Sequence, residues 1–86
     1  MDDVRARIAE FILEDMLFGD ESRMPAGEQS LLQSGVIDST GILELIEFIE
    51  TEFGFHVEDH ETIPENLDGI NRMAAYVQRK RATNRI

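Results

Sequence analysis

The hydrophobic pattern near the N-terminus of the chain is helical. Apolar residues recur there at intervals of three and four positions, and they are Val4, Ile8, Phe11 and Ile12. This spacing predicts a helix over about residues 3–18, whose first turn Asp2 or Asp3 can cap with a side-chain carboxylate. We expect Gly19 to end this helix, because glycine commonly follows the last helical residue.

The second helical pattern covers residues 39–53, and Gly54 is suited to the left-handed conformation that closes a helix. At about 100° per residue, the arc that faces the core contains Ile42, Leu45, Ile46, Ile49 and Phe53. The opposite side contains Thr40, Leu43, Glu44 and Glu47, with Glu50 at its margin. We expect this acidic strip to be exposed together with its leucine, although a single exposed leucine is ordinary on a protein surface.

The connecting segments contain their own apolar anchors. Residues 19–37 form a long connection rich in glycine and polar residues, and we expect Leu31, Leu32, Val36 and Ile37 to hold it against the core. Phe55 and Val57 pin the loop after the second helix, and residues 60–67 contain a short helical turn that Pro64 begins. A last helix over about residues 68–81 has its core positions at Ile70, Met73, Ala74 and Val77.

Together these patterns predict an all-α fold. No segment alternates polar and apolar residues with a period of two. Three longer helices, one short helix and a long loop between the first two make a small four-helix bundle. Eighty-six residues supply one core, since a chain of this size buries only about two thirds of its unfolded surface. We expect a single domain over residues 1–82 and a disordered tail over residues 83–86.

The composition excludes several classes of partner and chemistry. Eighteen acidic and eight basic residues give a net charge of −10, which repels nucleic acid and anionic membranes and favours basic protein surfaces. The chain has no cysteine, so it cannot form a disulfide, a thiolate metal site or a cysteine nucleophile. The charged N-terminal residues precede no long apolar run, so we expect no signal peptide, no membrane span and a cytoplasmic protein.

The residue that raises a chemical question is Ser39, at the predicted start of the second helix. A nucleophilic serine requires a nearby base and an oxyanion site. The two histidines, His56 and His60, both follow that helix, and Ile37 breaks the Gly-x-Ser-x-Gly pattern. We therefore expect no enzymatic activity. The histidines are four residues apart and could share a metal on a helix, but histidines among surface carboxylates are more often solvated.

Two interpretations of Ser39 follow from its position. Either Asp38 or Ser39 can cap the helix, and the spacing alone favours a capping role. The same position also suits a serine that will carry a phosphate, because unpaired N–H groups and the helix dipole stabilise an anion there. If Asp38 is the cap, the Ser39 hydroxyl is left free.

The chain resembles the acyl carrier proteins and their relatives, the peptidyl and aminoacyl carrier proteins. The resemblance centres on Gly35-Val36-Ile37-Asp38-Ser39, which is similar to the Gly-x-x-Asp-Ser-Leu signature of that family. The following Leu43-Glu44-Leu45-Ile46 and Phe53-Gly54-Phe55 are similar to its second helix. Residues 63–70, Ile-Pro-Glu-Asn-Leu-Asp-Gly-Ile, resemble its short third helix and the start of its fourth.

The resemblance implies that Ser39, with Asp38 as its motif neighbour, is the attachment site of phosphopantetheine. A phosphopantetheinyl transferase would take this group from coenzyme A, and acyl or aminoacyl cargo would ride on its thiol as a thioester. The other implied partners are an acyl- or amino-acid-activating ligase and a downstream acyltransferase or synthase. Their basic patches would dock on Thr40, Leu43, Glu44, Glu47 and Glu50, on a carrier that we expect to be a monomer.

Two residues depart from the family pattern. Thr40 follows the serine where leucine or methionine is usual, and Glu47 replaces a frequent apolar contact of fatty-acid carriers. Both changes make the docking face more polar, which favours a stand-alone carrier of a specialised pathway over the housekeeping fatty-acid carrier. The alternative is an unmodified acidic helical interaction module, in which Ser39 only caps a helix.

Overall fold

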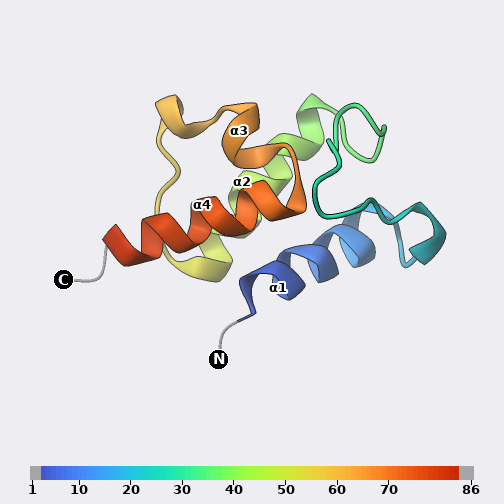
Figure 1. Ribbon diagram of the computed structural model, residues 1–86, viewed down its shortest axis with the longest axis horizontal. Coiled ribbons are helices and arrows are strands. Elements are labelled where there is room, and N and C mark those ends of the chain that lie inside the picture. The colour runs from blue at the N-terminus through green and yellow to red at the C-terminus, as the bar shows by residue number, and fades with distance from the viewer. Residues whose placement is uncertain (1–2, 84–86) are drawn as a thin grey trace.

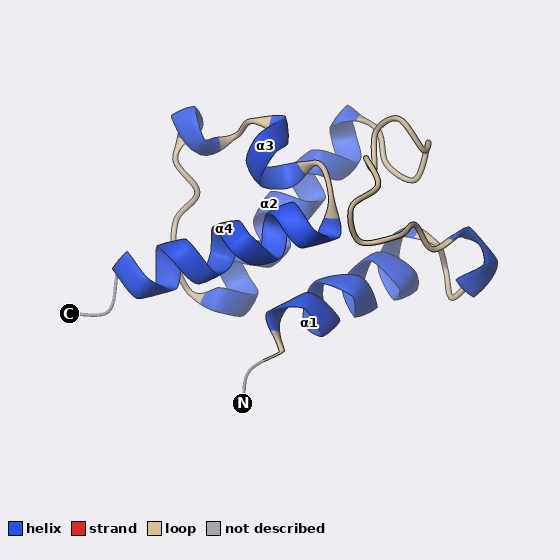
Figure 2. Cartoon of the chain, in the orientation of Figure 1, coloured by secondary structure: helices blue, strands red, loops and turns tan. Residues whose placement is uncertain are grey.

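The computed structural model describes residues 3–83, and helices joined by turns and loops make up this range, with no strand in it (Figures 1 and 2). The main helices are α1 (Val4–Phe11), α2 (Ser39–Phe53), α3 (Pro64–Leu67) and α4 (Ile70–Thr83). A π-helical turn (Ile12–Met16) extends α1, and single 3₁₀ turns occupy Glu21–Arg23 and Asp59–Glu61. The predicted all-α fold with a short third helix is confirmed.

One hydrophobic core joins the four main helices, the π-helical turn and the connections between them. In Figure 1, α1 and α3 lie on either side of α4, and α2 passes behind α4. The core residues are Val4, Ile8, Ile12, Leu17, Leu31, Ile37, Leu45, Ile49, Phe55, Val57, Leu67, Ile70, Met73, Ala74, Tyr76 and Val77. Each fully buried aliphatic side chain of this kind stabilises the fold by roughly 1.5–3 kcal/mol relative to exposure. The predicted core positions of α4 and the predicted anchors Phe55 and Val57 are confirmed.

The end of the first helical segment differs from the prediction. Asp3 caps α1 by accepting a hydrogen bond from the Ala6 N–H, at 3.0 Å. Regular α-helix then stops at Phe11, and the Leu17 N–H bonds to the Ile12 carbonyl at 3.0 Å, five residues back. This wider turn lets Ile12 and Leu17 both reach the core. The helix was expected to continue to residue 18, but its helical residues end at Met16.

The second helix has the bounds that the sequence predicts. Gly54 ends it in the left-handed conformation, with a φ of 75°. Leu45 and Ile49 are fully buried, whereas the other predicted core positions, Ile42, Ile46 and Phe53, are half-buried. Phe48 lies between the two faces and stacks on Phe11 of α1, with the ring centres 4.2 Å apart.

The long connection is held by two apolar residues and by one buried carboxylate. Leu31 and Ile37 are buried and Val36 is half-buried, but Leu32 is 41% exposed, so its predicted role as a core anchor is wrong. The reason is that Asp68 accepts hydrogen bonds from the Leu32 N–H, at 2.9 Å, and from the Ser30 hydroxyl. These bonds fix the backbone so that Leu31 points inward and its neighbour outward.

The start and end of α4 also differ from the prediction. The helix begins at Ile70 and not at Asp68, because Asp68 turns back to hold the long connection. Thr83 is the last helical residue, although residue 83 was expected to begin a disordered tail. The rest of that predicted tail, residues 84–86, lies outside the described residues. Among residues 3–83, no helix is long and apolar enough to cross a membrane.

Candidate functional site

Ser39 is the first residue of α2, and its side chain is exposed. The carboxylate of Asp38 caps the helix by accepting a hydrogen bond from the Gly41 N–H, at 2.9 Å. Within residues 3–83, no protein group hydrogen-bonds the Ser39 hydroxyl. Asp38 is therefore the cap, and the hydroxyl of Ser39 is left free for another role.

The backbone around Ser39 is suited to an anion. The helical hydrogen bonds begin at the Ile42 N–H, which donates to the Asp38 carbonyl at 3.1 Å. The N–H groups of Ser39 and Thr40 precede this ladder, and a helix of 15 residues adds the positive end of its dipole. A phosphate ester on Ser39 would lie where these groups stabilise negative charge.

Neither histidine lies at the start of α2, where Ser39 is. His56 follows the far end of α2, about 20 Å along a helix of this length. Its Nδ1 atom lies 2.9 Å from the Glu50 carboxylate. His60 is exposed in the Asp59–Glu61 turn. Residues 3–83 also contain no group of three or more histidine or acidic side chains that could hold a metal ion.

The acidic strip on α2 lies beside Ser39. Thr40, Leu43, Glu44 and Glu47 are all exposed, and Leu43 exposes 65% of its surface. Glu50 differs from the others, because its carboxylate accepts the Val57 N–H at 2.8 Å and is half-buried. The structure therefore leaves Glu44 and Glu47 open to solvent, while Glu50 holds the loop that follows α2.

An open hollow lies on one side of the Ser39 turn. It is formed where the end of the first helical segment meets the long connection and the start of α2. Its lining includes Asp15, Met16, Phe18, Val36, Thr40 and Glu44. Phe18 is 87% exposed at its rim, and Asp38 and Gly41 also line it. Sequence reasoning missed this hollow, because its walls come from three segments that only the folded chain brings together.

A second, smaller hollow lies between α2 and α3 and is almost entirely apolar. Leu32, Ile42, Ile63, Pro64 and Leu67 line it, together with Thr62 and Asp68. Its volume is about 140 Å³. The outward position of Leu32 places this residue in the lining of the hollow.

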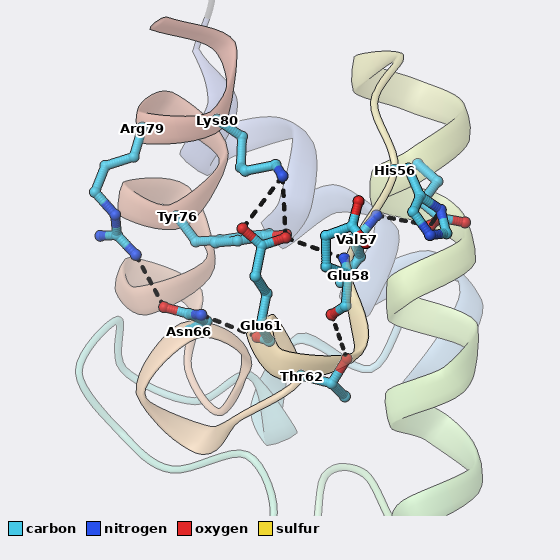
Figure 3. A network of polar contacts seen from close by, with 10 residues as sticks. His56, Val57, Glu58, Glu61, Thr62, Asn66, Tyr76, Arg79 and Lys80 are labelled. Carbon is cyan, nitrogen blue, oxygen red and sulfur yellow. Dashed lines mark hydrogen bonds and ion pairs between the residues drawn. The ribbon is translucent and has the colours of Figure 1, made fainter. Parts of the chain in front are cut away.

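A polar network fixes the segment between α2 and α3 onto α4 (Figure 3). The Glu61 carboxylate accepts hydrogen bonds from the Glu58 N–H, the Tyr76 hydroxyl and the Lys80 ammonium, each at 3.0 Å. Burial alone would raise the pKa of Glu61, but these bonds outweigh it and lower the pKa to about 2. Burial and the contact with Glu61 both raise the pKa of Tyr76 above its ordinary range.

The same network continues through Asn66. Its side-chain amide donates to the Glu61 carbonyl and accepts from Arg79 of α4, both at 2.9 Å. The loop after α2 and the short helix α3 are thus tied to one side of α4. Sequence reasoning missed Glu61 and Tyr76, and the only local signal was the Glu58-x-x-Glu61 spacing of a capping box.

Comparison of the chain with models of known protein families, with curated proteins and with solved structures found no match. No relative therefore supplies a function for it. The case for a function depends on the fold, on the free Ser39 hydroxyl at the start of α2, and on the acidic surface around it.

Proposed function

We propose that this protein is an acyl carrier, in which Ser39 bears a phosphopantetheine arm and the thiol of that arm bears the cargo. The proposal depends on one observation above all. Asp38 supplies the cap of α2, so the Ser39 hydroxyl is exposed and unbonded within the described residues, at the positive end of the helix dipole. The resemblance of the Gly35–Ser39 segment to the signature of acyl carrier proteins supports the same role.

The attachment reaction explains why Ser39 needs no base of its own. The Ser39 oxygen attacks the phosphorus of coenzyme A that bears the pantetheine. The new phosphodiester bond forms as the pyrophosphate bond breaks, and adenosine 3′,5′-bisphosphate leaves. The hydroxyl proton passes to a base of the phosphopantetheinyl transferase. The remaining negative charge of the phosphodiester stays near the first N–H groups of α2.

Cargo attached to the arm would be delivered by tethering. Acyl or aminoacyl groups would be held as thioesters, and the short tether would raise their concentration near each partner enzyme. The chain has no cysteine, so the arm would supply the thiol. We propose a ligase that loads the cargo and an acyltransferase or synthase that receives it, in the cytoplasm and in a specialised pathway.

Partner enzymes would dock on the acidic strip. Glu44 and Glu47 are exposed beside Ser39 and are open to basic side chains, and the exposed Leu43 lies on the same face of α2. Charged contacts of this kind speed association more than they tighten binding, which suits a carrier that must leave each partner. The competing function is an unmodified acidic interaction module, which the exposed strip would serve without any modification of Ser39.

Intact mass measurement separates the two functions. The protein is incubated with coenzyme A, Mg²⁺ and a broad-specificity phosphopantetheinyl transferase, and we expect it to gain the mass of one phosphopantetheine. Ser39→Ala should gain nothing. Ser22→Ala is the control, because Ser22 is also an exposed serine in the first turn after an aspartate cap, Asp20, but its hydroxyl bonds to that carboxylate. An unmodified wild-type protein would favour the interaction module.

A further inference from the structure

Phe18 is the most exposed large apolar side chain in residues 3–83, at 87%. It is also the one non-glycine residue of this range with a positive φ, at 54°. Bulky side chains rarely adopt this left-handed conformation, because Cβ approaches the following carbonyl. Glycine would fit the turn with less strain, as it does at the next position, Gly19.

The folded chain gives no packing reason for a phenylalanine here. The ring is almost wholly in water, so it gains little from burial. Gly19 closes the turn by itself, since its N–H donates to the Leu13 carbonyl at 2.7 Å. A strained residue that contributes little to the fold is a reason to look for a role outside it.

The Phe18 ring lies at the same hollow as the chain neighbours of Ser39. Phe18 lines the open hollow, and Asp38 and Thr40, the two chain neighbours of Ser39, line the same hollow. Asp15 and Glu44 add carboxylates to the lining, and both are exposed. The surface around Ser39 is therefore an exposed aromatic ring among carboxylates.

We propose that Phe18 is the anchor by which the phosphopantetheinyl transferase binds this carrier. The ring would insert into an apolar pocket of the transferase, and basic side chains around that pocket would face Asp15 and Glu44. Aromatic side chains that fill such pockets dominate the binding energy of protein interfaces, and charged rims guide the approach. This inference rests on the proposed function of Ser39.

The shared hollow favours the transferase over the enzymes that handle cargo. The substrate of the transferase is the Ser39 hydroxyl itself, so this enzyme must cover the residues beside Ser39. Enzymes that act on the cargo would dock on the acidic strip and meet the cargo at the far end of a long arm, so they need not cover Phe18. The carboxylates disfavour an anionic membrane or a nucleic acid as the occupant.

The test is the steady-state rate of phosphopantetheine transfer from coenzyme A, measured with a purified broad-specificity transferase as the concentration of this protein is varied. We expect Phe18→Ala and Phe18→Gly to raise KM about tenfold and to leave kcat within about twofold of wild type, as loss of a binding anchor does. Ile63→Ala is the control. This substitution also shortens an exposed apolar side chain, but Ile63 lines the other hollow. The KM of Ile63→Ala should therefore equal that of the wild type.

The outcomes separate this inference from the proposed function. If the wild-type protein is modified and both Phe18 variants keep the wild-type KM, Phe18 is not the anchor, while the carrier function stands. If the wild-type protein is not modified, the carrier function fails and the anchor with it. Circular dichroism should show unchanged helicity in Phe18→Gly, so a raised KM in that variant reports binding and not loss of the fold.

Discussion

The Asp38 carboxylate accepts a hydrogen bond from the Gly41 N–H at 2.9 Å, and this bond separates the structural and chemical roles of two adjacent residues. Asp38 begins the helix, and Ser39 is available for modification. The N-cap preference for both residue types explains why sequence alone could not assign the roles. The folded backbone assigns them, because the Gly41 N–H donates to Asp38.

Replacement of Asp38 tests its capping role. We expect Asp38→Ala to lower the free energy of unfolding by about 1 kcal/mol, because the Gly41 N–H loses its partner. Asp38→Asn should retain most of the stability, since an asparagine oxygen caps equally well. Urea unfolding measures both. Equal stability of Asp38→Ala and the wild type would contradict the assignment of the cap.

Acid should weaken the network around Glu61. The pKa of Glu61 is lowered in the fold from its ordinary value near 4.5 to about 2, so its stabilising contribution is complete above about pH 5. It is lost as the pH falls towards 2, because the unfolded chain takes up the proton first. The free energy of unfolding should therefore fall less between pH 5 and pH 2.5 in Glu61→Gln than in the wild type. Parallel pH profiles would contradict this.

Tyr76 provides the corresponding test at high pH. Burial and the hydrogen bond to Glu61 raise the pKa of Tyr76, so the fold favours the neutral phenol. Its contribution is complete below pH 10 and is lost as the pH rises further, because the unfolded chain ionises first. Tyr76→Phe should lower the free energy of unfolding by about 1 kcal/mol at pH 7. Above pH 10, the free energy of unfolding of this variant should fall less steeply with pH than that of the wild type. Circular dichroism follows the unfolding.

Phe18→Gly should not destabilise the protein, although it removes a large apolar side chain. The left-handed conformation costs a bulky residue about 1–2 kcal/mol, and Phe18→Gly removes this cost. The greater entropy of a glycine in the unfolded chain offsets about 0.5–1 kcal/mol of that stabilisation. We expect a net stabilisation of about 0.5 kcal/mol in urea unfolding. Phe18→Val, which is branched at Cβ, should be less stable than the wild type. A large loss of stability in Phe18→Gly would show that the ring supports the fold.

Charge reversal on the acidic strip tests partner docking. Glu44→Lys/Glu47→Lys should slow modification by the transferase several-fold, and the difference should shrink at high salt as the charges are screened. The matched control is Glu28→Lys/Glu65→Lys, which changes the net charge equally at two exposed glutamates away from the strip. Both double variants should keep their helicity. Equal slowing in the two would mean that only the total charge matters.

The parts of the fold that the sequence predicts are those set by local patterns. The second helix follows its Asp38 and Gly54 signals at both ends, and its exposed strip follows from the helical period. The π-helical turn is different, because an extra residue shifts the period between Ile12 and Leu17. Regular helical spacing therefore does not predict the burial of Leu17.

The parts of the site that the sequence does not predict depend on contacts between distant segments. Asp68 holds residues more than thirty positions away along the chain, and Glu61 meets Tyr76 and Lys80 of α4 only in the folded protein. The sequence does not predict the positive φ of Phe18 either, because Gly19 is the residue to which a turn prediction would assign the left-handed conformation. The location of Ser39 could be predicted, but not the hollow beside it.

The absence of cysteine from the chain permits a direct test of the central claim, that Ser39 bears a thiol-terminated arm. The measurement is the number of maleimide groups that the protein takes up before and after incubation with coenzyme A and the transferase, once free coenzyme A has been removed. The account predicts none before and one after for the wild-type protein, and none at either stage for Ser39→Ala. A treated wild-type protein that takes up no maleimide, or a Ser39→Ala protein that takes up one, would contradict it.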